Sequence, residues 1–279
     1  MVVERLLPLE FLKRSHWAGF VVGWSYCLIS MVIALYTFPQ DPALVTVGLT
    51  SILLLPSLGR FSALERSIES NEGSVNLRGI FRANKDFYMT YLAIFFGMFF
   101  VFAIFAILLP SLASSKLFET QLAILTGRAF NPGLFLQLLS NNIVVLLACF
   151  LLSLVAGNGS IFLITWNASV WGTIFGITAK SAATALQGNP FILFILVLIS
   201  VFPHVFLEIS SYIVGTISGA VISDSVIDDG VKSEKFFKVL GYNLVLFAIA
   251  LALLVVGGLV EAYVIGNFKV YSTIIAFAR

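Results

Sequence analysis

Long runs of apolar residues dominate the chain and are separated by short polar stretches. Several runs exceed the roughly 18 residues that indicate a transmembrane helix. They are continuous, whereas a transmembrane β-barrel requires alternation. Because lipid accepts only helices and closed barrels as spanning structures, the pattern predicts an all-α polytopic membrane protein, a bundle of about six to seven transmembrane helices. The predicted spans are about 17–37, 43–59, 88–110, 131–156, 160–179, 190–223 and 236–265.

Composition supports the membrane class and argues against several others. Hydrophobic residues make up 59% of the chain and charged residues 11%, against about 25% charged in a typical soluble domain. The net charge of +2 is too small to indicate nucleic-acid binding, so the lipid bilayer is the first expected partner. Cys27 and Cys149 lie inside predicted spans without metal-ligand spacing. No phosphate-binding or dinucleotide motif is present, and neither a cofactor nor a metal is predicted.

The segment 190–223 does not read as a regular span. From Pro190 to Phe202 a helix would cover only about 20 Å, too short for a hydrocarbon core of roughly 30 Å. We therefore predict a single crossing that is broken or kinked near Pro203. The alternative is that residues 190–202 form a re-entrant segment.

The positive residues predict the orientation. Lys and Arg occur before residue 17 and again in 60–87, whereas the 38–42 turn has none. By the positive-inside rule the N-terminus is cytoplasmic, in a multi-pass protein of the cell membrane. The predicted organisation is an amphipathic lead-in at 1–16, an N-terminal transmembrane part at 17–130 with a charged cytoplasmic loop at 60–87, a transmembrane core at 131–266, and a tail at 267–279.

One face of the helix that follows Pro203 carries polar residues at its start and small residues in its middle. Helical periodicity places seven residues on this stripe. Gly215 and Gly219 form a small-xxx-small pair of the kind that lets another helix approach closely, and Gly172 and Gly176 form a second. The stripe is expected to pack against protein, with the pairs serving helix packing or self-association. Its members are His204, Glu208, Ser211, Gly215, Ser218, Gly219 and Ile222.

Glu208 is the residue that most needs an explanation. A charged side chain at the centre of a span costs on the order of 2.5–3.5 kcal/mol on insertion scales. Protonation, pairing with His204, or hydrogen bonds to other helices would each lower that cost. The cluster is either interhelical structure or a proton or substrate site at a broken helix. The expected intramembrane polar cluster is Glu208, His204, Asn141, Asn142, Asn167 and Glu261, with Glu261 near the interface and Asn243 as a further candidate partner.

Several blocks of the sequence resemble the stage II sporulation protein M family over roughly residues 135–265, and the N-terminal part looks most like its archaeal branch. The family's polar motif residues fall on the cluster given above. Val205, Phe206 and Leu207 depart from the family pattern, which usually has a small residue after the histidine and a proline before the glutamate. The matching blocks are Asn141-Asn142, GNGSIFLITWNASVWGTIFG at 157–176, PHVFLEISSYIVGTISGAVIS at 203–223, and GGLVEAYVI at 257–265.

The resemblance implies a membrane protein that is not an enzyme. The sporulation member is a scaffold that recruits peptidoglycan-degrading partners, so the first hypothesis is a self-associating scaffold that organises envelope-associated or cytoplasmic proteins. The second is a transporter or channel for a small solute, ion or lipid that uses His204 and Glu208. The third hypothesis is an intramembrane hydrolase that uses His204 with a serine.

Overall fold

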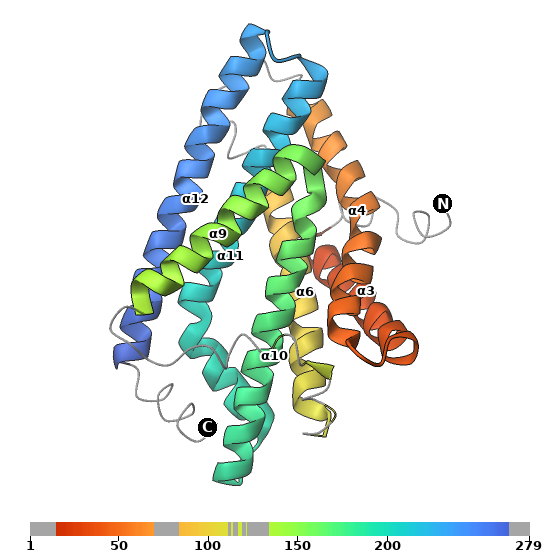
Figure 1. The fold of residues 1–279 in the computed structure, drawn as a ribbon, viewed down its shortest axis with the longest axis vertical. Helices are drawn as coiled ribbons and strands as arrows, with labels where there is room; N and C mark the ends of the chain where they lie inside the picture. The colour runs from red at the N-terminus through yellow and green to blue at the C-terminus, as the bar shows by residue number, and fades with distance from the viewer. Residues whose placement is uncertain are drawn as a thin grey trace.

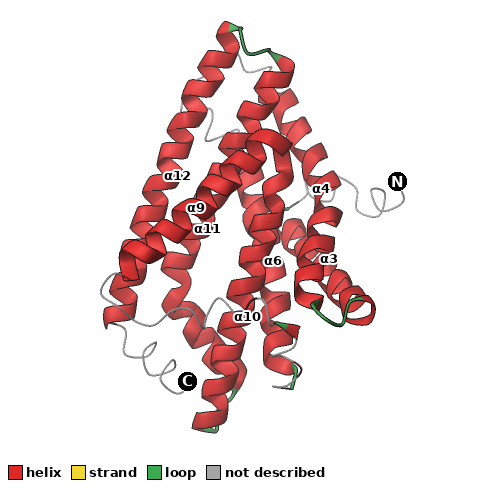
Figure 2. Ribbon diagram, in the orientation of Figure 1, coloured by secondary structure: helices red, strands yellow, loops and turns green. Residues whose placement is uncertain are grey.

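The computed structural model describes residues 15–69, 84–110, 113, 117–118, 121 and 134–267. Helices account for nearly all of these residues, and no strand occurs among them (Figure 2). The all-α prediction is therefore confirmed. The predicted lead-in before residue 15, the charged loop from 70 to 83, and the tail after residue 267 lie outside the described residues.

In the described parts of the chain, seven long helices of 22 to 39 residues form the bundle (Figure 1). Six segments of these described parts are long and apolar enough to cross a membrane. One of these, Leu139–Leu186, holds two helices and the 3-10 turn η1 (Gly157–Ser160) between them. The helices are α3 (His16–Thr37), α4 (Pro42–Glu69), α6 (Lys85–Leu108), α9 (Leu134–Ala156), α10 (Ile161–Leu186), α11 (Pro190–Asp228) and α12 (Glu234–Asn267).

Several helices extend beyond the limits predicted from hydropathy. Helix α4 continues to Glu69, so residues 60–69 are helical and the prediction of a loop there is wrong. Ala, Leu, Glu and Arg in this stretch are good helix formers even where the sequence is too polar to span lipid. In the same way α10 runs to Leu186, where Gln187 adopts the left-handed conformation that ends it.

Helix α11 passes through Pro203 without interruption. Its start is capped by Asn189, whose side-chain oxygen accepts hydrogen bonds from Phe191 N and Ile192 N. The whole of Pro190–Asp228 is one candidate span, so the structure favours a single crossing over a re-entrant segment. Figure 1 shows the helix bend in its N-terminal half. A proline removes one backbone hydrogen bond, which accounts for a bend without a break.

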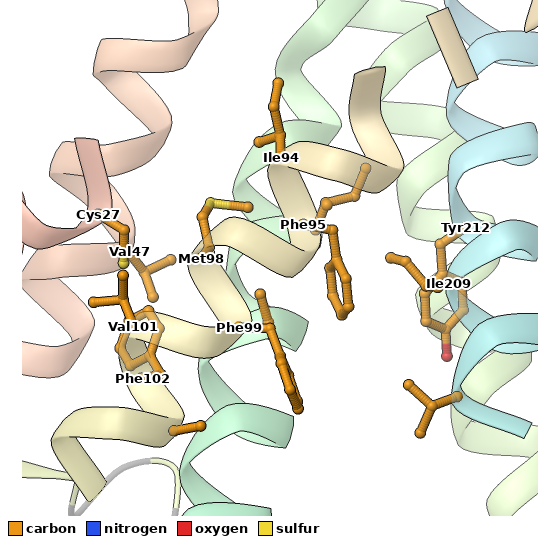
Figure 3. Packing of buried hydrophobic residues seen from close by; sticks show 14 of the residues in the cluster. Cys27, Val47, Ile94, Phe95, Met98, Phe99, Val101, Phe102, Ile209 and Tyr212 are labelled. Carbon is orange, nitrogen blue, oxygen red and sulfur yellow. The ribbon is translucent and has the colours of Figure 1, made fainter. Parts of the chain in front are cut away.

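Helix α6 lies at the centre of the hydrophobic core (Figure 3). It packs on α3 and α10 and also reaches α11. Its aromatic run is buried, with Phe95 stacked on Phe99 and packed edge-on against Trp171 of α10. Such aromatic pairs contribute beyond the area they bury.

Glycines allow the backbones around α6 to come close together. A Cβ atom at Gly23 would lie 2.4 Å from Ile94 O, and one at Gly97 would lie 2.3 Å from Phe20 O. Gly172 stands in the same relation to Phe99 O, at 2.4 Å. Real side chains do not tolerate these distances, so α3, α6 and α10 pack at a separation that only glycine permits.

Lys180 of α10 forms a hydrogen bond to the C-terminal end of α6. Its Nζ donates a hydrogen bond to the backbone oxygen of Leu109, the residue that caps α6 at its C-terminus. The last carbonyl groups of a helix lack partners within the helix and carry the negative end of its dipole. A lysine at this point satisfies one of those carbonyl groups and places a positive charge near the dipole.

We expect Lys180→Met to lower the free energy of unfolding by about 1 kcal/mol, because the carbonyl group loses its partner and the dipole its counter-charge. Lys180→Arg is the matched control and should retain most of the stability. Thermal unfolding of the purified protein in detergent measures both variants. Equal losses in the two variants would show that the fit of the lysine, and not its charge, matters.

Candidate functional site

Glu208 lies where three helices meet. Its side chain is 5% exposed, and its Oε1 accepts a hydrogen bond of 2.8 Å from Asn142 Nδ2 of α9. On the α12 side, Gly257 packs directly on it: a Cβ atom there would lie 3.2 Å from Leu207 Cβ and 3.4 Å from Glu208 Cγ. The carboxyl group therefore connects α9 to α11 beneath a close contact with α12.

His204 lies one turn before Glu208 and is 7% exposed. Its Nδ1 has no hydrogen-bond partner among the described residues. Helices α11 and α12 run antiparallel, because Ser218 Oγ donates to Asn243 O at 2.6 Å while Gly257 meets Leu207 and Glu208. One turn further along this register, Glu261 is level with His204.

Pairs of side chains between α6 and α11 place this cluster within the apolar part of the bundle. The hydroxyl groups of Tyr88 and Ser210 are 2.7 Å apart and share a hydrogen bond. Phe96 stacks on Phe202 with ring centroids 6.2 Å apart. Glu208 lies between these two levels, alongside the candidate span Lys85–Leu108.

The remaining polar residues of the predicted cluster have different surroundings. Asn141, next to Asn142, is exposed on the surface of α9. Asn167 donates from Nδ2 to Leu163 O in its own helix, at 2.8 Å. Asn243 likewise donates to Val239 O, at 2.9 Å. Of the four asparagines considered from the sequence, Asn142 is the one hydrogen-bonded to Glu208.

The polar and small stripe of α11 faces protein, as predicted, since all seven of its residues are buried. Gly219 meets the backbone of α9, with Phe150 O 2.3 Å from the position of a Cβ atom, whereas Gly215 meets the side chain of Leu146. Gly172 and Gly176 meet α6. These small-residue faces, considered for self-association, are therefore covered by the chain's own helices.

Two contributors were missed in the sequence. The sequence shows Gly257 only as part of the block GGLVEAYVI, although a double glycine in an apolar run signals a close approach. Tyr88 falls within a predicted span, and nothing in the sequence indicates that its hydroxyl group meets Ser210. Within the described part of the chain, no group of three or more His, Cys, Asp or Glu side chains is placed to hold a metal ion.

Fold and site together define a multi-pass helical membrane protein with a buried, hydrogen-bonded carboxyl group. Comparison with protein families makes this more specific, because the model of stage II sporulation protein M matches residues 90–264. The chain belongs to this family. The match begins within α6, covers α9, α10 and α11 completely and ends in the last turn of α12, whereas α3 and α4 precede it. Comparisons with curated proteins and with solved structures gave no match.

Proposed function

We propose that the chain is a non-enzymatic scaffold of the cell membrane that organises envelope-associated or cytoplasmic partner proteins. One observation carries most of the proposal: the Glu208 carboxyl group is buried, bonded to Asn142 and packed beneath Gly257. An ionisable group enclosed in this way fixes how α9, α11 and α12 pack. Family membership, with the role that the sporulation member suggests, supports the same function.

In this proposal the N-terminus is cytoplasmic. Helix α3 runs parallel to α6, because Gly19 lies beside Thr90 and Gly23 beside Ile94. The start of α3 is therefore at the end of the bundle where Lys85 begins α6. Figure 1 shows η1 and the loop between α11 and α12 towards this end and the 38–41 and 187–189 turns towards the other. The α11–α12 loop adds Lys232 and the first turn of α12 adds Lys235, consistent with the positive-inside rule.

The experiment that tests the proposal compares the wild type with Glu208→Gln in reconstituted liposomes. An amide keeps the hydrogen-bonding capacity of a neutral carboxyl group but cannot carry a charge or a proton. We expect no flux of protons, ions or small solutes that depends on Glu208. We also expect both proteins to recover the same partner proteins from cross-linked native membranes. A flux that Glu208→Gln abolishes without loss of stability would refute the scaffold.

The second candidate function is a transporter or channel for a small solute, ion or lipid. It is favoured by the Nδ1 atom of His204, which is buried beside a proline bend and has no hydrogen-bond partner among the described residues. Transporters commonly build sites at interrupted helices in the middle of the membrane. Liposomes that contain His204→Ala distinguish the two functions. A transporter would show a flux that this substitution lowers, whereas a scaffold would show no flux with either protein.

A further inference from the structure

The outer face of α9 carries an amide group where an apolar side chain would be expected. Asn142 points inward to Glu208. Consecutive helical residues point about 100° apart, so the neighbouring Asn141 projects away from this contact, and it is exposed. No hydrogen bond joins its side chain to any described residue. Because the two asparagines are adjacent, Asn141 lies at the depth of Glu208, alongside the apolar spans.

Asn141 and residues that follow it at helical spacing along α9 form a largely exposed seam. Val144 is 64% exposed, Leu151 53% and Val155 84%. Together with Asn141 and the half-buried Ala148, these residues follow one another at spacings of three, four, three and four. This is the spacing of the contact positions of a coiled coil, and Asn141 occupies a position equivalent to Val155, two heptads away. We define the α9 seam as Asn141, Val144, Ala148, Leu151 and Val155.

An amide group exposed to hydrocarbon lacks the hydrogen bonds that water would provide, so asparagine in a span favours association with another helix. The amide group both donates and accepts, so it is complementary to a copy of itself across a two-fold axis. A single asparagine among apolar contact positions is also a known means of fixing a parallel pair of identical helices. These features favour a second copy of the same chain over an unrelated partner.

We propose that two copies of the chain associate through the α9 seam, with the Asn141 side chains hydrogen-bonded to each other near the two-fold axis. The interface differs from the small-residue faces predicted from the sequence, which are buried within one copy. It also places the dimer contact one residue away from Asn142, so the interface and the Glu208 site share one turn of α9. The proposal is independent of the scaffold function.

The first test measures association of the full-length protein in lipid. Donor-labelled and acceptor-labelled copies are reconstituted in liposomes and diluted with lipid while energy transfer is recorded. We expect Asn141→Leu to weaken association roughly 3- to 30-fold, the range measured for polar contacts between transmembrane helices. Asn141→Gln, which keeps an amide group, should recover most of the affinity. Because Asn141 is exposed, the leucine variant is expected to fold, and thermal unfolding verifies this.

A second test locates the interface. Cys27 and Cys149 are the only cysteines of the chain, and both are buried, so an added surface cysteine is the accessible thiol. We expect oxidative cross-linking between copies with Val144→Cys. The matched control, Ile199→Cys, is equally exposed on α11 at 64% and should give none. A monomeric wild type, association that Asn141→Leu leaves unchanged, or equal cross-linking at both positions would each overturn the proposal.

Discussion

Replacing Gly219 by alanine is expected to lower the free energy of unfolding by about 2 kcal/mol. The added Cβ atom would lie 2.3 Å from Phe150 O and 3.0 Å from Ser153 Cβ, so α9 and α11 must move apart along part of their contact. Overpacking of this kind costs roughly 1–3 kcal/mol, and occasionally more. The higher helix propensity of alanine offsets at most about 1 kcal/mol of this loss of stability.

Two other glycines provide matched controls for Gly219→Ala. At Gly215 the added atom would meet Leu146 Cδ1 at 2.5 Å, the end of a side chain that can change its rotamer. We expect Gly215→Ala to change the stability by less than about 0.5 kcal/mol, since helix propensity offsets the adjustment. At Gly48 a Cβ atom would have no neighbour within 4 Å. Gly48→Ala should therefore stabilise α4 by about 0.5–1 kcal/mol.

Unfolding of the three variants in mild detergent, titrated with a denaturing detergent, tests the predicted order. Equal stabilities for Gly215→Ala and Gly219→Ala would contradict the close approach of the α9 and α11 backbones. A large loss with Gly48→Ala would mean that the outer surface of α4 is covered in the folded protein.

Removing the carboxyl group of Glu208 should have an effect of similar size. We expect Glu208→Ala to destabilise the protein by about 1–3 kcal/mol, because the partly buried Nδ2 atom of Asn142 loses its acceptor. Glu208→Gln should be nearly neutral, because the amide oxygen can still accept from Asn142. A strongly destabilised Glu208→Gln would show that the charge itself holds the helices together.

A double-mutant cycle isolates the contact between Glu208 and Asn142. Asn142→Leu alone should also destabilise the protein, since it leaves the carboxyl oxygen without this donor. If the two side chains act through their hydrogen bond, the double variant should cost less than the sum of the single variants by about 0.5–3 kcal/mol. Additive effects would show that the two residues act separately, despite the 2.8 Å distance between Asn142 Nδ2 and Glu208 Oε1.

The inward face of α11 could be predicted because its polar and small residues recur at helical spacing, whereas residues such as Ile199 and Phe202 lie elsewhere and are exposed. The sequence limited the hydrogen-bond partner of Glu208 to a few asparagines, but it could not tell whether Asn141 or Asn142 makes the bond. Helix α9 is apolar on all sides, so its sequence leaves its rotation about its own axis undetermined. The packing against α11 sets that rotation and sends one asparagine inward and the other outward.

The ends of the helices were also hard to predict, because hydropathy and helix propensity do not end at the same residue. Hydropathy marks where a segment stops being compatible with lipid, while the backbone stays helical as long as its residues favour a helix. For this reason α4 continues beyond the end of its apolar run and reaches Glu69. The role of Gly257 depends on which helix lies against it, and that partner, α11, is almost 50 residues away in sequence.

Helix α9 makes few contacts with α10, the next helix in the chain, and packs mainly on α11. Ribosomes deliver helices in order, so α9 enters the bilayer before the α11 residues that accept its inward face. During that interval Asn142 has no Glu208 to bond, and the surface that later receives Gly219 is open to lipid. The contacts that α9 makes through Asn142 and with Gly219 can therefore form only after α11 has been made, so α9 reaches its final packing late, although it precedes α10 and α11 in the chain.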